Sequence, residues 1–177
     1  MRIGVVSDTH GELDNLREAV RQLLDRWQVS TLVHLGDECE DLHVLHEFPE
    51  LDLIQVHGVY CQHYQDPNIV NRLLKEIEGH RFLFTHTDQP HKNDLPGDPD
   101  PQVLARQGLV DVVAYGHSHI PDIRKEGNVL WLNPGHLKDN DKKGHDPTYA
   151  VVELSSEGGS IYLVNLKSQV VVDSETI

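Results

Sequence analysis

The feature that most constrains the fold of this chain is a series of short apolar runs, each followed by a glycine or a polar residue. Three of these runs lie in the first third of the chain, at residues 2–7, 31–35 and 51–56. Residues 12–28 place apolar side chains at helical spacing, and residues 41–48 form a shorter helical candidate. Strands that alternate with helices in this way indicate βαβ units and a mostly parallel sheet.

The middle of the chain continues this alternation. Apolar side chains at helical spacing predict a helix over residues 68–77, and a strand follows at residues 81–85. Residues 88–101 are rich in proline and aspartate, which predicts a long surface loop. A short helix at residues 101–107 and a strand at residues 110–115 complete this part.

Strand signals dominate the last third. Residues 122–126 and 129–133 predict two short strands joined at Gly127-Asn128, a pair that is typical of a hairpin turn. Three more strands are predicted, at residues 149–154, 160–166 and 169–173. The chain shows no internal repeat, low-complexity tract or linker. We therefore expect a single domain over residues 1–177, in the α/β class.

Composition argues against several classes of protein. The 177 residues include 29 acidic and 15 basic side chains, and the net charge of −14 argues against binding to a nucleic-acid polymer. The apolar runs are far shorter than the roughly 20 residues that span a membrane, and the first residues lack a signal-peptide pattern. Two cysteines are too few for a disulfide scaffold and fit a reducing compartment. We therefore expect a cytoplasmic protein with no membrane partner.

Candidate metal ligands follow four of the predicted strands. They are Asp8 and His10, then Asp37, then His86, and finally His117 and His119. Ligands bind at the carboxyl ends of strands in open α/β sheets, so we expect these side chains to meet. Carboxylates and imidazoles together suit Zn, Mn and Fe. Thirteen histidines in the chain make this pattern the first candidate for a functional site.

The order of these pieces resembles the calcineurin-like metallophosphoesterase family, in particular its short prokaryotic phosphodiesterase branch. The matching segments are Asp8-Thr9-His10, Gly36-Asp37, Thr85-His86, Gly116-His117-Ser118-His119 and Asn133-Pro134-Gly135. The resemblance extends from Arg2 to about Leu154. It implies a four-layer α/β/β/α sandwich, in which two mixed β-sheets face each other and helices lie outside.

The resemblance also implies a role for each of the six candidate residues. One metal ion would be held by Asp8, His10 and His119, the other by His86 and His117, and Asp37 would bridge the two. The implied cofactors are two divalent ions, with Mn, Zn, Fe, Ni and Mg as candidates. A metal-bound hydroxide would then attack a small phosphate ester, more specifically a phosphodiester. Asp37, His86 and His117 are the catalytic candidates, and a homodimer or higher homo-oligomer is compatible with the sequence.

The sequence departs from the family pattern after the third predicted strand. The family carries Gly-Asn there, and its asparagine ligates the second metal, whereas this chain has Gly58-Val59, and valine offers no lone pair. In one interpretation His57, His63, Asp88 or a water completes the second site, and the protein is an enzyme. In the other, the protein is a metal-binding scaffold or interaction module with weak or no catalysis.

Five further side chains lie in or near these segments. His34 lies within a predicted buried strand and is expected to be a core histidine with satisfied hydrogen bonds. His91 in the long loop is a candidate for a substrate contact, and His136 is a candidate for a position near the metals. Cys39 and Cys61 are expected to be free thiols, with metal ligation or a redox pair as the alternative.

An acidic cluster follows the second predicted strand and consists of Glu38, Glu40 and Asp41. We expect it to be part of a solvated loop. Asp41 has the alternative role of accepting a hydrogen bond from a metal ligand.

Overall fold

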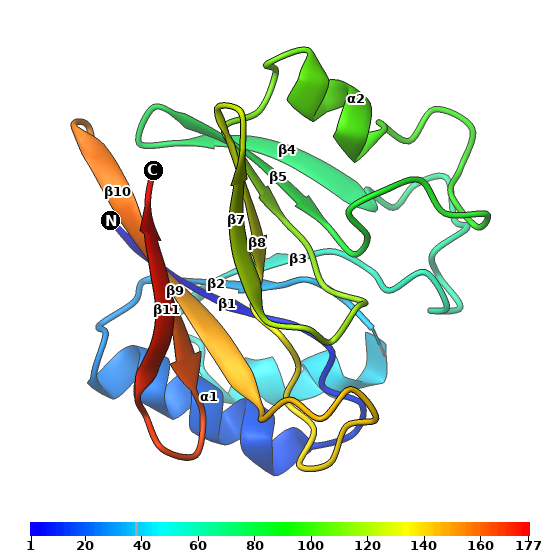
Figure 1. Ribbon diagram of the computed structural model, residues 1–177. Helices are drawn as coiled ribbons and strands as arrows, with labels where there is room; N and C mark the ends of the chain where they lie inside the picture. Colours follow the sequence, from blue (N-terminus) through cyan, green and yellow to red (C-terminus); the bar gives the residue numbers. More distant parts are fainter. Residues whose placement is uncertain (38) are drawn as a thin grey trace.

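The computed structural model describes residues 1–37 and 39–177, and these residues form two β-sheets that face each other (Figure 1). The larger sheet consists of β1 (Arg2–Val6), β2 (Thr31–His34), β3 (Asp52–Gln55), β9 (Thr148–Ser155), β10 (Gly158–Asn165) and β11 (Val171–Thr176). The smaller sheet consists of β4 (Arg72–Ile77), β5 (His80–Thr85), β6 (Val112–Ala114), β7 (Asp122–Glu126) and β8 (Val129–Asn133). Their orders are β11-β10-β9-β1-β2-β3 and β4-β5-β6-β8-β7.

Both sheets are mixed, as the family resemblance implied. Strands β1, β2 and β3 run parallel, and so do β5, β6 and β8, whereas all other neighbours are antiparallel. Parallel neighbours end at the same edge of a sheet. Backbone hydrogen bonds therefore join the loop after β1 to the loop after β2, and the loop after β6 to the loop after β5.

Helices cover the outer faces of the two sheets (Figure 1). Helix α1 (Leu13–Asp25) and the 3₁₀ helix η1 (Cys39–Glu47) pack on the larger sheet, and α2 (Pro101–Arg106) packs on the smaller one. The expected order of helix, sheet, sheet and helix is confirmed, with only a short helix over the smaller sheet. Among the described residues, no helix has both the length and the apolar character that crossing a membrane requires.

Strand β1 contributes side chains to two apolar layers, one on each face of the larger sheet. Ile3 and Val5 pack in the core between the two sheets, whereas Val6 packs against α1. A Cβ on Gly4 would lie 2.6 Å from a methyl group of Leu23, so glycine at this position lets α1 approach the sheet closely. A strand that is buried on both faces has a continuous apolar sequence rather than an alternating one.

The predicted helix over residues 68–77 is wrong, because the second half of that segment forms edge strand β4. This strand pairs antiparallel with β5 through a tight turn at Glu78 and Gly79, both of which have positive φ. Leu74, which belonged to the predicted apolar stripe, is 50% exposed. In an apolar run this short, periodicity does not distinguish a helix from a strand. The turn before β5, which is typical of a hairpin, indicates a strand.

Arg72 at the start of β4 is buried and organises the long loop after β5. Its side chain is 1% exposed, and Nη2 lies 2.7 Å from Oδ2 of Asp94. The guanidinium also donates to the carbonyl oxygens of Gln89 and Pro99, at 3.2 and 2.6 Å. Arg72 thus holds the predicted surface loop from its inner side at three points.

We predict that Arg72→Ala lowers the free energy of unfolding by about 3–5 kcal/mol, because it leaves the carboxylate of Asp94 without its charged partner. Denaturant-induced unfolding measures this loss. Arg17→Ala is the control, because Arg17 forms an exposed pair with Glu47 at 2.8 Å and its loss is expected to change the unfolding midpoint far less. Similar losses in the two variants would contradict a central role for the buried pair.

Candidate metal centre

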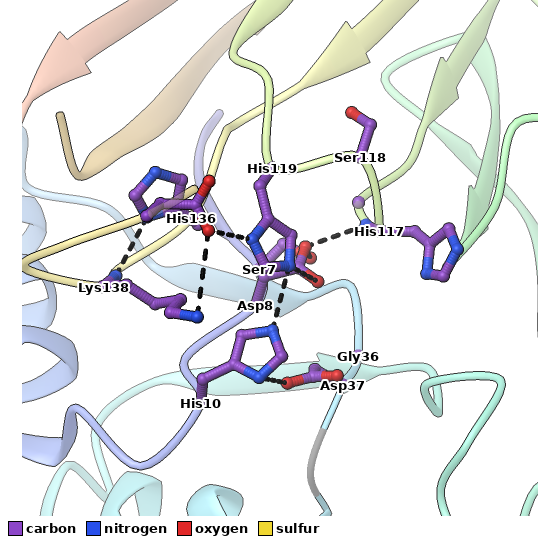
Figure 2. A network of polar contacts seen from close by, with 12 residues as sticks. Ser7, Asp8, His10, Gly36, Asp37, His117, Ser118, His119, His136 and Lys138 are labelled. Atoms are coloured by element: carbon purple, nitrogen blue, oxygen red, sulfur yellow. Dashed lines mark hydrogen bonds and ion pairs between the residues drawn. The ribbon is translucent and has the colours of Figure 1, made fainter. Parts of the chain in front are cut away.

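The six predicted ligands lie in the loops at the carboxyl ends of four strands. Asp8 and His10 follow β1, Asp37 follows β2, His86 follows β5, and His117 and His119 follow β6. The backbone N–H of Asp8 donates to the carbonyl of Gly36, and that of Gly116 donates to the carbonyl of His86, each at 3.1 Å. The structure therefore brings all six side chains to one place, and Figure 2 shows five of them together with their hydrogen-bond partners.

A first group consists of Asp8, His10 and His119, whose ligand atoms lie within 4.8 Å of one another. The Nε2 atoms of His10 and His119 are 2.9 Å apart, and Nε2 of His119 lies 3.4 Å from Oδ1 of Asp8. Figure 2 shows the two imidazole rings facing each other beside the Asp8 carboxylate. These are the three residues that the family resemblance assigned to the first metal ion.

A second group adjoins the first and consists of Asp8, Asp37 and His86, again with ligand atoms within 4.8 Å of one another. His117 contacts this group through Nδ1, which lies 3.2 Å from Nε2 of His86. Oδ2 of Asp37 lies 2.8 Å from Nδ1 of His10. Asp37 therefore lies between the two groups, where a bridging carboxylate is expected, and Asp8 belongs to both groups.

The donor atoms of these two groups fit divalent cations. Oδ1 of Asp8 and Oδ2 of Asp37 are buried and have no hydrogen-bond partner among the described residues, since the short contact between Asp37 and His10 lacks hydrogen-bond geometry. A buried carboxylate oxygen without a partner is energetically costly. A cation at this position removes that cost, and the set of carboxylates and imidazoles suits Zn, Mn and Fe.

The backbone is strained at the candidate ligands. Positive φ angles occur at five of them: 54° at Asp8, 49° at His10, 129° at Asp37, 65° at His117 and 61° at His119. Residues with a Cβ rarely adopt this region, and each such residue costs about 1–3 kcal/mol. Strain of this kind persists only where the surrounding structure enforces it, and it clusters at functional sites. Its concentration here supports a functional role for these loops.

Two glycines let the loops approach each other closely. A Cβ on Gly116 would lie 2.6 Å from Oδ2 of Asp8, and a Cβ on Gly58 would lie 2.5 Å from Cα of Asp37. Neither distance is compatible with a side chain, so alanine at either position would displace a candidate ligand. The absence of a side chain at these two glycines is thus required for the observed positions of Asp8 and Asp37.

Hydrogen bonds outside the cluster orient its imidazole rings. Nδ1 of His119 donates to Oδ1 of Asp141 at 2.7 Å, and Nδ1 of His86 donates to the carbonyl oxygen of Leu35 at 2.8 Å. With Nδ1 protonated, the lone pair of each ring is on Nε2, which faces the other candidate ligands. The rings are therefore held in the tautomer and orientation that metal binding requires.

Asp8 is held in its charged form by its neighbours. Oδ2 accepts hydrogen bonds from Oγ of Ser7 at 2.6 Å and from the backbone N–H of His117 at 2.9 Å. Burial acts to raise the pKa of Asp8, but the contacts with His119, His86 and Ser7 outweigh it and lower that pKa below its usual value. The same contact with Asp8 raises the pKa of His119. Asp8 is therefore an anionic side chain at neutral pH, as a metal ligand would need to be.

Asp141 was not among the residues predicted from the sequence, and it lies between β8 and β9. Its carboxylate accepts hydrogen bonds from His119 and from the backbone N–H of Lys143, the latter at 2.7 Å. Burial acts to raise the pKa of Asp141, but these hydrogen bonds lower it well below its usual value. No spacing rule connects Asp141 to His119, because the two loops meet only in the folded chain.

The expectation of a solvated acidic loop is wrong for Asp41. Asp41 is buried, and its Oδ2 accepts a hydrogen bond from the backbone N–H of Gly11 at 2.7 Å. It therefore fixes the turn that carries His10 instead of contacting a ligand side chain. Glu38, from the same predicted cluster, lies outside the described residues.

Two of the remaining histidines have both ring nitrogens paired. The prediction of a satisfied core histidine is confirmed for His34, which is buried and bonds Oγ1 of Thr9 at 3.0 Å and the N–H of Gly36 at 3.2 Å. Burial lowers the pKa of His34 to about 4, so the ring is neutral at pH 7. His136 lies beside His119, but its nitrogens bond the backbone of Lys138 and His145, so it is not available as a ligand.

Val59 is buried at the place where the family has its asparagine. Its backbone oxygen accepts a hydrogen bond from Nδ2 of Asn93 at 2.8 Å, so the long loop held by Arg72 lies against it. Asp88, one of the expected replacements, lies 3.4 Å from Nη2 of Arg124 and is not in either ligand group. His57 groups with the two cysteines instead, and His63 is in no ligand group of the described residues.

His91 from the same loop lies beside the second ligand group. Its ring centroid is 6.0 Å from that of His117 and 5.6 Å from that of Tyr60. Nδ1 of His91 accepts the backbone N–H of Asn93 at 3.2 Å. The proton of the neutral ring is therefore on Nε2, which makes this nitrogen a hydrogen-bond donor.

The expectation of free thiols at Cys39 and Cys61 is wrong, because the structure joins them in a disulfide. Cys39 begins η1 after β2, Cys61 lies in the loop after the neighbouring parallel strand β3, and their Cα atoms are 6.2 Å apart. This distance is ordinary for a disulfide. The two cysteines are therefore bonded to each other and not free thiols.

Comparisons with known proteins agree with this architecture. The sequence matches the calcineurin-like phosphoesterase superfamily domain over residues 1–157. It is 32% identical over 148 residues to phosphodiesterase MJ0936 of Methanocaldococcus jannaschii, which corresponds to 76% of this chain and 83% of that protein.

Two solved structures share the fold. Yfce, a phosphoesterase from E. coli, superposes with a TM-score of 0.72 at 21% identity and covers 99% of this chain and 98% of its own. Vps29 of Entamoeba histolytica, in complex with Zn²⁺, superposes with a TM-score of 0.66 at 21% identity and covers 100% and 98%. At this identity the two structures establish the fold alone. From the match over residues 1–157 and the 32% identical relative, the chain belongs to the calcineurin-like phosphoesterase superfamily.

Proposed function

We propose that this protein is a metal-dependent phosphoesterase that hydrolyses a small phosphate ester, preferentially a phosphodiester. One observation carries this proposal: six candidate carboxylate and imidazole ligands from strand ends of both sheets lie together, and two of their buried oxygens have no hydrogen-bond partner among the described residues. The 32% identity to a phosphodiesterase supports the choice of substrate class.

Two divalent ions, when bound, supply the positive charge that activates a water and neutralises the phosphate. Among the chain's own residues, Asp8, His10 and His119 would hold one ion, and His86 and His117 would hold the other. Asp37 would be the ligand that both ions share. The donor set is compatible with Mn, Zn, Fe, Ni and Mg, and the net charge of −14 means that attraction of an anionic ester depends on these local cations.

The surroundings of the centre suit a small substrate. A pocket of about 420 Å³ adjoins it and is lined by His10, Asp37, Glu40, Tyr60, Cys61 and Gln62. This volume is in the range of small-molecule sites. His91, with its proton on Nε2, is placed to donate a hydrogen bond to a phosphate oxygen, in place of the amide that Val59 cannot provide. Tyr60, which is 69% exposed, forms the outer wall beside His91.

A second candidate function is a metal-binding scaffold with weak catalysis. Val59 favours it, because its side chain is buried at the second ligand group and cannot bind a metal. The two functions differ in whether the ion that His86 and His117 would hold must be bound. A hydrolytic enzyme needs this second ion bound at the metal concentrations under which it acts, whereas a scaffold does not need it.

We predict that Asp37→Asn and His117→Ala each lower metal-dependent kcat/KM for an aryl phosphodiester by about 100-fold or more, because each removes a ligand of the second ion. Turnover is measured with added Mn²⁺, Ni²⁺, Zn²⁺ or Mg²⁺, and a phosphomonoester is assayed in parallel. His145→Ala replaces an exposed histidine outside the cluster and is expected to retain full activity. If the wild-type chain shows no metal-dependent turnover above Asp37→Asn, the enzyme proposal fails.

Asp141→Asn is expected to weaken binding of the first metal ion by roughly 10–100-fold, because His119 loses the carboxylate that fixes its ring and tautomer. Calorimetric titration of the metal-free chain measures this affinity. Asp139→Asn is the matched control in the same loop, since Asp139 pairs with Lys167 at 2.8 Å and contacts no candidate ligand. Unchanged affinity in Asp141→Asn would show that Asp141 does not orient His119.

Val59→Asn restores the family's side chain at nearly constant volume, and we predict that it tightens binding of the second metal ion by about tenfold or more. The measurement is metal stoichiometry at limiting concentration, followed by hydrolysis of the aryl phosphodiester. A rise in both supports a deficient second site in the natural chain. No change in either would show that another group already completes that site.

A further inference from the structure

A third group of metal-ligating side chains lies beside the proposed centre and has no role in the proposed hydrolysis. Sγ of Cys39, Sγ of Cys61 and a ring nitrogen of His57 lie within 4.8 Å of one another. Cys39 begins η1 just after Asp37, and His57 and Cys61 lie in the loop after β3. Because β2 and β3 are parallel neighbours, the two loops lie side by side.

Two observations indicate that this group can take a ligand. Nδ1 of His57 is buried and has no hydrogen-bond partner among the described residues, which is costly for an imidazole nitrogen. A separate pocket of about 310 Å³ opens on the group, and its lining includes Cys39, His57, Glu40, His43 and His46. The group is therefore accessible to an ion, and further donor side chains line its entrance.

We infer that Cys39, His57 and Cys61 form a zinc site in the reduced chain and that the disulfide between the cysteines is its metal-free, oxidised form. Two thiolates with one imidazole select Zn²⁺ over Mn²⁺ or Mg²⁺, which prefer oxygen ligands. Three protein ligands leave the fourth position of the tetrahedron open to the pocket. The site thus differs chemically from the first two groups, which contain no sulfur.

Conversion between the two forms is a two-electron reaction. With hydrogen peroxide as oxidant, the S–S bond forms between Cys39 and Cys61 and the O–O bond breaks. The two thiols give up two electrons and two protons, and the peroxide becomes two molecules of water. The sulfur atoms cannot hold the ion once they are bonded to each other, so oxidation releases the zinc.

The position of this site links it to the proposed catalytic pocket. Cys61 lines the 420 Å³ pocket together with His10 and Asp37. Oxidation of the cysteines or binding of zinc by them therefore changes the wall of this pocket. The zinc site itself rests only on its own three side chains. It stands whether or not the protein hydrolyses phosphate esters.

Cobalt substitution tests the inference, because thiolate ligation of Co²⁺ gives an intense near-ultraviolet charge-transfer band that oxygen and nitrogen ligands do not give. The full chain is reduced with a phosphine, stripped of metal and titrated with Co²⁺. We expect the band at saturating Co²⁺ to have the intensity of one thiolate-bound ion per chain, to disappear on addition of Zn²⁺, and to be absent after oxidation with hydrogen peroxide. Absence of the band from the reduced chain at saturating Co²⁺ would overturn the inference.

Variants separate this site from the proposed catalytic centre. Cys61→Ser is expected to abolish most of the band, and His57→Ala is expected to weaken Co²⁺ binding at this site at least tenfold. His117→Ala, which alters only the catalytic centre, is expected to retain the band, and so is the surface control His145→Ala. Persistence of the full band in Cys61→Ser would contradict the assignment, whereas loss of hydrolysis in any variant does not bear on it.

Discussion

The buried carboxylate of Asp8 is the interaction on which the rest of the site depends. It follows β1 of the larger sheet, and its Oδ2 accepts the backbone N–H of His117, which follows β6 of the smaller sheet. One side chain thus joins the two sheets at the edge where the ligands meet. Its other oxygen has no hydrogen-bond partner among the described residues, and Asp8 belongs to both ligand groups. A bound cation would balance this charge and would couple the packing of the sheets to metal binding.

The sequence identified the candidate ligands that directly follow strands. Asp8, Asp37, His86 and His117 each follow an apolar run. Parallel pairing brings Asp8 to Asp37 in the larger sheet and His86 to His117 in the smaller sheet, and the packing of the two sheets brings the two pairs together. Asp141 could not be found in this way, because it reaches His119 from a loop without regular structure. The helix predicted over residues 68–77, where the structure has β4, is wrong for a different reason. An apolar run of this length is compatible with helix or strand, and pairing with β5 determined the outcome.

The part of the site that departs from the family is built by one continuous segment. Arg72 holds the loop after β5 from inside, Asn93 of that loop bonds the backbone of Val59, and His91 lies beside His117. Where the family pattern has asparagine, this chain thus has a buried valine and a loop that brings the imidazole of His91 near His117. Under the proposed function, this loop would supply a contact to the substrate.

We propose above all that the two adjoining ligand groups bind two divalent ions. Anomalous diffraction from crystals of the reduced chain grown with Mn²⁺ tests this proposal directly, because Mn²⁺ prefers oxygen and nitrogen ligands to the sulfur atoms nearby. We expect two anomalous peaks, one among Asp8, His10 and His119 and one beside His86 and His117, with Asp37 between them. Full-occupancy Mn²⁺ elsewhere, with no peak at these residues, would contradict it.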